Sequence, residues 1–147
     1  MSLEQILSLI PHRAPMLLLD KILLLESDNI LCQKTFNAAE FFFQGHYPNQ
    51  PIVPGVILCE AGMQAGACLL STKILEDKTG DLTDKVPVAT RINNVKFKQM
   101  VKPGDTIELA ITLTDRVSSA FFLDAKVTVD GKLATRFDFA CTLADAQ

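Results

Sequence analysis

Two ionisable side chains stand out in the apolar segment 41–66. His46 lies in a proline-rich loop, and Glu60 follows fourteen positions later on a stretch with helical character. A histidine that titrates near neutral pH can remove a proton, and a carboxyl group kept protonated by an apolar site can donate one. The pair therefore suits proton removal next to a carbonyl, coupled to loss or addition of an oxygen at the β-carbon.

Each of the two residues also has a purely structural explanation. A buried carboxylate without a partner costs several kcal/mol, so Glu60 could simply bind a hydrogen-bond donor or reach solvent through a gap. A lone histidine in a loop is most often structural or exposed. Gln64 lies one turn after Glu60 on the same helix face and could hold its carboxyl group in place.

The loop that carries His46 is predicted to be rigid. Pro48, Pro51 and Pro54 recur at every third position, and each proline ring fixes the backbone φ angle. A rigid loop that leads directly into a helix can hold a histidine in one orientation, as a preorganised site requires.

The start of the following helix offers a third chemical group. Pro54 and Gly55 open it without Ser, Thr, Asp or Asn at the N-cap, so its first N–H groups and the helix dipole could bind a developing negative charge. The alternative is an end capped by water or by carbonyls of the loop. Cys59 points about 100° away from Glu60 on an apolar helix, and we do not expect it to be a nucleophile.

The elements that must position these groups follow from hydrophobic periodicity and turn residues. The C-terminal half is predicted to be all strand, and Asp130-Gly131 is a two-residue hairpin signal. One long helix against a largely antiparallel sheet is an α+β domain. We expect helices at 2–10 and 55–74, and strands at 16–25, 30–36, 86–98, 107–113, 120–129 and 132–143.

The long helix is apolar on nearly all sides, which predicts a central, buried position. Gly62 and Gly66 lie one turn apart and roughly opposite Glu60. Bare backbone at these positions would let the sheet pack closely. We prefer this explanation of the GxxxG spacing to membrane dimerisation, which needs an apolar stretch of about 20 residues.

Composition is that of a globular protein, and 1–147 is expected to form a single domain. A net charge of −3 gives no indication of nucleic-acid binding. The four cysteines are widely spaced and none lies near a histidine at metal-ligand spacing, which predicts reduced thiols and no metal. No cofactor motif is present. The first residues lack a secretory pattern, and we expect a cytoplasmic protein without membrane insertion.

The segment around His46 and Glu60 resembles the 3-hydroxyacyl-[acyl-carrier-protein] dehydratases of FabZ type, in the hot-dog superfamily. Other similar segments are LIPHRAPMLLLDKI, VKFKQMVKPGD and VDGKLA, so the resemblance covers essentially the whole chain. It implies a hot-dog fold, with a long central helix wrapped by a curved antiparallel sheet. The matching positions are Phe42, Phe43, Gly45, His46, Pro48, Pro51, Ile52, Pro54, Gly55, Val56, Glu60, Ala61 and Gln64.

The resemblance also implies a reaction, the dehydration of a (3R)-3-hydroxyacyl thioester to the trans-2-enoyl thioester in type II fatty-acid or related acyl-chain synthesis. His46 would take the α-proton, Glu60 would protonate the leaving hydroxyl, Gly55 N–H would polarise the carbonyl and Gln64 would orient Glu60. Family members form dimers, often assembled into hexamers, with His46 and Glu60 from different subunits in one site. Glutamate favours the type that dehydrates without isomerising, since FabA-type enzymes carry aspartate there.

The implied substrate is bound to acyl carrier protein, an acidic partner that needs basic side chains near the tunnel mouth. Lys96, Lys98 and Lys102 are the candidates, with Arg91 less favoured; each could equally be a solvated residue of a strand face. The chain departs from the family where Gln99 and Met100 replace the usual arginine and proline, among other positions. His12 belongs to the family-like segment PHR and is interpreted as structural, since no acidic partner is near it in sequence.

Two other functions remain open on the sequence. One is a different reaction on the same fold, a hot-dog thioesterase or an enoyl-CoA hydratase; thioesterases of this fold usually lack the paired GHxP and PGVxxxE pattern. The other is a non-catalytic hot-dog subunit that binds acyl chains. Retention of both His46 and Glu60 argues against it.

Overall fold

A computed structural model of the chain describes residues 2–77 and 84–145. Two α-helices, a short 3-10 helix and six strands occur in those ranges. Helix boundaries agree with the periodicity, although the long helix continues to Glu76. The elements in chain order are α1 (Leu3–Leu9), β1 (Lys21–Leu25), β2 (Asn29–Thr35), η1 (Phe41–Phe43), α2 (Gly55–Glu76), β3 (Lys85–Phe97), β4 (Thr106–Val117), β5 (Ala120–Val129) and β6 (Lys132–Asp145).

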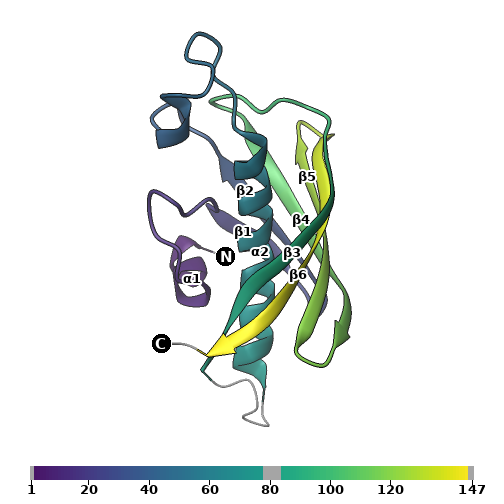
Figure 1. Ribbon diagram of the computed structural model, residues 1–147. Coiled ribbons are helices and arrows are strands. Elements are labelled where there is room, and N and C mark those ends of the chain that lie inside the picture. Colours follow the sequence, from purple (N-terminus) through teal and green to yellow (C-terminus); the bar gives the residue numbers. More distant parts are fainter. Residues whose placement is uncertain (1, 78–83, 146–147) are drawn as a thin grey trace.

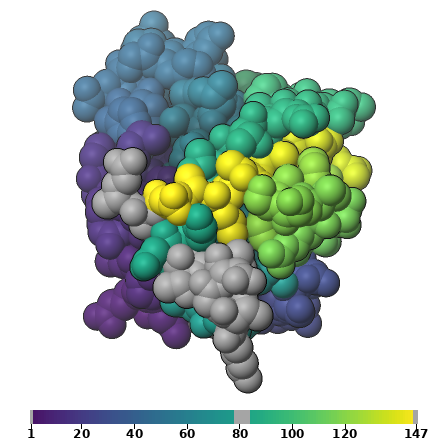
Figure 2. Space-filling view, turned by 60° about the horizontal axis from the view of Figure 1, so that its bottom comes forward, coloured from purple at the N-terminus to yellow at the C-terminus, as the bar shows by residue number. Residues whose placement is uncertain are grey.

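The strands form one antiparallel sheet in the order β1-β2-β4-β5-β6-β3. Helix α2 runs along one face of this sheet, and α1 lies on the other side of α2 (Figure 1). The N-terminal segment and the region of residues 40–50 lie on the same side of the molecule, away from the β4–β5 hairpin (Figure 2). This arrangement confirms the expected α+β hot-dog fold.

Strand β4 shows that one face of the sheet is buried. Alternate residues of β4 are buried and exposed from Thr106 to Ile111, as the two-residue period of a half-covered strand requires.

Asp130 and Gly131 join β5 to β6 with φ angles of 52° and 76°. Positive φ at both central residues is the geometry of a type I′ hairpin turn, and it confirms the predicted hairpin.

The two glycines of α2 let the sheet approach its backbone. A Cβ atom on Gly62 would lie 2.8 Å from the Phe137 ring, and one on Gly66 would lie 2.6 Å from the Phe139 ring. Both rings are buried on β6. The GxxxG spacing therefore serves close packing of helix and sheet, as expected.

Residues 16–20 differ from the prediction, because the strand expected at 16–25 begins only at Lys21. The amide of Leu18 and the carbonyl of Met16 both bind the side chain of Gln64, on α2. Backbone groups that are satisfied by a side chain do not need a neighbouring strand. Apolar composition alone does not reveal this arrangement.

Helix α2 is long and apolar enough to cross a membrane by length and composition. Of the apolar window that passes this test, 56% is buried inside the protein. That burial is what the core helix of a folded domain shows, and it accounts for the hydropathy without a membrane.

Candidate active site

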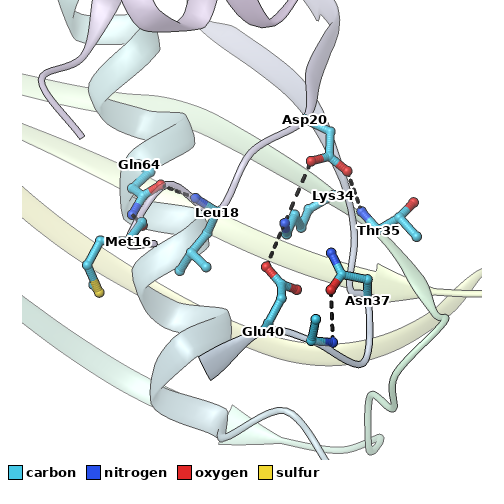
Figure 3. A network of polar contacts seen from close by, with 9 residues as sticks. Met16, Leu18, Asp20, Lys34, Thr35, Asn37, Glu40 and Gln64 are labelled. Atoms are coloured by element: carbon cyan, nitrogen blue, oxygen red, sulfur yellow. Dashed lines mark hydrogen bonds and ion pairs between the residues drawn. The ribbon is translucent and has the colours of Figure 1, made fainter. Parts of the chain in front are cut away.

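Glu60 is held by a network that begins at the backbone. Gln64 is 1% exposed, and its Nε2 group donates to Oε2 of Glu60 at 2.8 Å. The same amide donates to Met16 O at 2.8 Å and accepts from Leu18 N at 2.8 Å (Figure 3). The Glu60–Gln64 contact agrees with their one-turn spacing, whereas the anchoring of Gln64 on residues 16–18 was not predictable from it.

His12 also lies at this carboxyl group. Its Nε2 atom is 3.6 Å from Oε2 of Glu60, so an acidic partner absent from the local sequence is supplied by α2. The sequence offers no acidic partner near His12, but the fold supplies one, so the stated ground for the structural interpretation does not hold in the folded protein. Only a contact between residues 48 positions apart places it there, and the sequence carries no local signal for it.

His46 occupies a different environment, in the loop before α2. Its Nδ1 atom is 3.0 Å from the carbonyl oxygen of Ile52, and its ring meets Tyr47 edge-on with centroids 4.8 Å apart. A carbonyl only accepts, so Nδ1 carries the proton and Nε2 has the free lone pair. The Ile52 carbonyl thus prepares the ring to accept a proton at Nε2.

A pocket of about 600 Å³ opens beside His46. Its wall includes Gly55 and Val56 at the start of α2, and the segment from Phe97 to Val101. Within the described ranges Glu60 is not one of its lining residues. One chain therefore brings the imidazole, the helix start and an apolar pocket together, but not the carboxyl group.

The start of α2 has the properties expected from the sequence. Pro54 is the N-cap, and among the described residues no side chain caps this end. A Cβ atom on Gly55 would lie 2.5 Å from the Phe97 ring, so any larger residue would require that ring to shift. Gly55 lines the pocket, so its N–H group is a candidate donor to a carbonyl oxygen bound there.

A buried ion pair fixes the beginning of the His46 loop. The Nζ group of Lys34 lies 2.9 Å from Oε1 of Glu40 and 3.7 Å from Oδ1 of Asp20 (Figure 3). The side chains of Lys34 and Glu40 are 8% and 13% exposed. Glu40 directly precedes η1, so this contact ties the chain to β2 six residues before His46. Sequence reasoning missed it, because the partners come from separate elements.

The basic residues considered for carrier binding do not gather at the pocket. Lys98 lines it. Lys96 instead lies opposite Arg136 across the β3–β6 pair, and the backbone N–H of Lys102 closes a turn onto Asp105. Arg91 pairs with Ala140 further along β3. Lys98 is thus the candidate that the pocket geometry favours.

The cysteines are unsuited to nucleophilic chemistry. All four are free and buried. Burial raises the pKa of Cys68 to about 12 and that of Cys141 to about 11, and it also raises the pKa of Cys59 and Cys32. A thiol with a raised pKa forms little thiolate near neutral pH, in agreement with the expectation for Cys59.

Strand β3 is an uncovered sheet edge next to the pocket. Within the described ranges it pairs only with β6, and most of its length is exposed on both faces. Its apolar residues Val88, Ile92 and Phe97 are at least 40% exposed. Long apolar edges are unusual in proteins that remain single chains.

Solved structures with this fold include enzymes of two kinds. The dehydratase heterocomplex ApeI:P from Xenorhabdus doucetiae aligns with a TM-score of 0.79 at 15% identity, covering 95% of this chain and 91% of that one. A hypothetical thioesterase with coenzyme A from Streptococcus pneumoniae aligns with a TM-score of 0.64 at 9% identity, covering 86% and 87%. The fold is thus the hot-dog fold that dehydratases and thioesterases share.

Sequence comparison separates these two classes. The family model described as the FabA-like domain matches residues 10–138. The 3-hydroxyacyl-[acyl-carrier-protein] dehydratase FabZ of Oenococcus oeni is 41% identical, covering 94% of this chain and 96% of its own. The enzymes of that name from Clostridium perfringens and Burkholderia cenocepacia are 40% and 35% identical, over 91% and 99% of this chain and 92% and 93% of their own. The chain belongs to the FabA-like family, and the resemblance to FabZ-type dehydratases is confirmed.

Proposed function

We propose that the protein is a hydro-lyase that converts (3R)-3-hydroxyacyl-[acyl-carrier-protein] to the trans-2-enoyl thioester in type II fatty-acid biosynthesis. The observation that carries this proposal is the protonation pattern set by the fold. His46 lines an apolar pocket and its Nδ1 is bound by Ile52 O, which leaves Nε2 to act as the base. Gln64 binds Oε2 of Glu60, which leaves Oε1 to carry the proton. These are the base and the acid that a dehydration needs.

Dehydration divides between these two groups. Nε2 of His46 removes the α-proton, the double bond forms between the α- and β-carbons, and the β-hydroxyl leaves as water with a proton from Glu60. The reaction leaves His46 protonated and Glu60 ionised, and exchange with solvent restores both. The Gly55 N–H group and the dipole of α2 stabilise the negative charge that develops on the thioester oxygen.

The acid and the base come from two copies of the chain in this proposal. Among the described residues of its own chain, no carboxyl group lines the pocket beside His46, while the edge strand β3 is available to pair with a second copy. Edge pairing between two β3 strands around a two-fold axis would bury the exposed apolar residues of both. A homodimer is therefore the smallest active unit; association of dimers into a hexamer, as the family resemblance implies, would leave this unit intact.

The carrier protein presents the substrate at the pocket mouth. Lys98 supplies positive charge there for an acidic carrier, with Lys96 and Lys102 on the adjoining surface. We also propose that the 147 residues form one domain in the cytoplasm, since α2 packs on strands from both halves of the chain and 56% of its apolar window is buried within the protein.

Hydration of a trans-2-enoyl thioester tests the proposal, since it is the same reaction in reverse. The substrate is presented on acyl carrier protein and on coenzyme A, and loss of its conjugated absorbance is followed. We expect activity on the carrier-bound form and a loss of about 1000-fold in His46→Ala, the usual contribution of a general base. A folded protein that hydrolyses the thioester instead, or an active His46→Ala variant, would contradict it.

A further inference from the structure

We propose that His12 is a positioning residue that acts through Glu60. Together with Gln64 it holds Oε2 of the carboxyl group, so that the transferable proton stays on Oε1. The inference rests on the proposed function, and it concerns a histidine in the segment between α1 and β1, outside the pocket that contains His46.

The orientation of the Gln64 amide determines which oxygen of Glu60 carries the carboxylic proton. The Gln64 carbonyl oxygen must accept from Leu18 N, and its amino group must donate to Met16 O. The amino group therefore also donates to Oε2 of Glu60 at 2.8 Å. An oxygen that accepts from this fixed donor is a poor position for the carboxylic proton, so the proton belongs on Oε1.

The tautomer of His12 follows from the same geometry. Nε2 faces Oε2 of Glu60 at 3.6 Å, while Nδ1 is buried and has no hydrogen-bond partner in the described part of the chain. A proton on Nδ1 would be buried without an acceptor, whereas one on Nε2 points to the carboxyl group. His12 thus directs a second N–H group at the oxygen that Gln64 already binds, at an ion-pair distance and not at hydrogen-bond distance.

The segment that carries His12 is anchored on both sides. The guanidinium group of Arg13 donates to the carbonyls of Leu7, Ile10 and His12 at 3.0, 2.9 and 2.7 Å. Further along, Met16 and Leu18 are bound by Gln64. The backbone around His12 is therefore tied to α1 at one end and to α2 at the other, which gives its ring a defined position beside Glu60.

Two donors on one oxygen have a consequence for catalysis. When Glu60 gives up its proton from Oε1, the carboxylate that forms is stabilised by the donors on Oε2. This help arises in the transition state and not on substrate binding. Loss of His12 should thus lower kcat and leave KM nearly unchanged.

The first test compares His12→Leu with His12→Gln in the wild-type background. Leucine removes the donor, whereas the glutamine amide can place an N–H group near the position of Nε2. We expect kcat to fall about 10-fold in His12→Leu, because the carboxylate that forms on Glu60 loses a nearby polar N–H group that stabilises its charge. His12→Gln should recover most of the rate, and KM should stay within about twofold in both. Equal losses in both variants, or no loss in His12→Leu, would overturn the proposal.

A second test uses mixed assemblies of His46→Ala and Glu60→Gln chains, co-expressed with different affinity tags. In a shared site, the His46→Ala chain supplies the one working Glu60. His12→Leu should lower activity about 10-fold when placed on that chain and have almost no effect on the Glu60→Gln chain. Both placements contain the same substitutions in total, so a general folding defect would affect them equally.

Equal losses in the two placements would assign His12 a structural role and overturn the inference. A parent mixed assembly without activity would instead show that His46 and Glu60 do not share a site between chains. That result contradicts the proposed dimeric site, and the comparison of leucine with glutamine at position 12 then decides the role of His12 on its own.

Discussion

The two regions that carry the proposed acid and base are built in opposite ways. Around Glu60 there is a tight network, in which Gln64 and residues 12–18 fix one carboxyl oxygen. Around His46 there is open space, with a pocket of about 600 Å³, one hydrogen bond to Ile52 O and an apolar wall. One region positions a carboxyl group outside the pocket, and the other has a pocket without a carboxyl group among its described lining residues.

This difference explains why one chain would be incomplete for the proposed reaction. The side chains that fix a carboxyl group would fill the space that an acyl chain needs. One pocket in a single chain therefore cannot serve both purposes. The exposed edge of β3 lies next to the pocket and offers the surface through which a second copy could join the two regions. Three substitutions and one matched control test this comparison.

The largest effect is expected at the edge strand. Ile92 pairs with Phe139 on the α2 side of the sheet and is 40% exposed. Ile92→Asp would place a charge in each half of a symmetric interface, at a cost of several kcal/mol per dimer. We expect a folded monomer with activity reduced more than about 100-fold, measured by light scattering and turnover.

Leu23→Asp is the matched control for this substitution. Leu23 is 42% exposed and lies on β1, the opposite edge strand. It should keep both the dimer and the activity. A monomeric Ile92→Asp protein with full activity would show that one chain suffices and that the two regions are joined in another way.

An intermediate effect is expected at Gln64, which connects the carboxyl region to the backbone. Gln64→Leu leaves Leu18 N–H and Met16 C=O without their partner and removes the hydrogen bond to Oε2 of Glu60, which then keeps only the His12 contact. Unfolding free energy should fall by roughly 3 kcal/mol, and kcat should fall at least about 10-fold. Denaturant melts and steady-state kinetics measure the two effects; a stable variant with unchanged kcat would mean that Glu60 needs no such support.

The smallest effect on turnover is expected at Lys34, which anchors the loop before His46. Lys34→Met keeps the length of the side chain but leaves Glu40 as a buried charge without its partner. Breaking one member of a buried pair costs about 3 kcal/mol. Stability should therefore fall while kcat changes only a few-fold, because the Ile52 contact of His46 remains. A variant that matches wild type in a denaturant melt would contradict the anchoring role.

The sequence predicted contacts between residues that are close to one another along the chain. Glu60 and Gln64 meet because a helical turn brings i and i+4 together, and Asp130-Gly131 turns because both residues tolerate positive φ. The strict alternation in β4 follows from a sheet with one dry face. Such local geometry is encoded in spacing, and it was read correctly.

Other features depended on contacts between distant segments. Residues 16–20 have the apolar composition of a strand, yet the side chain of Gln64 binds their backbone groups instead. β3 has apolar residues that suggest a covered strand, and its edge position leaves them exposed. The hydrophobic periodicity of a strand indicates which of its faces is buried in the folded protein. It does not indicate which other element covers that face.

The sequence by itself therefore determined the hot-dog elements, the His46 and Glu60 motif and the family of the chain. Only the tertiary structure decided that His12 faces Glu60, that Lys34 holds Glu40 and that Glu60 lies outside the pocket containing His46. The physical reason is the distance along the chain between the residues that are in contact. Spacing along a helix or strand fixes neighbours within about one turn, whereas packing across the fold brings together side chains whose separation in sequence carries no signal.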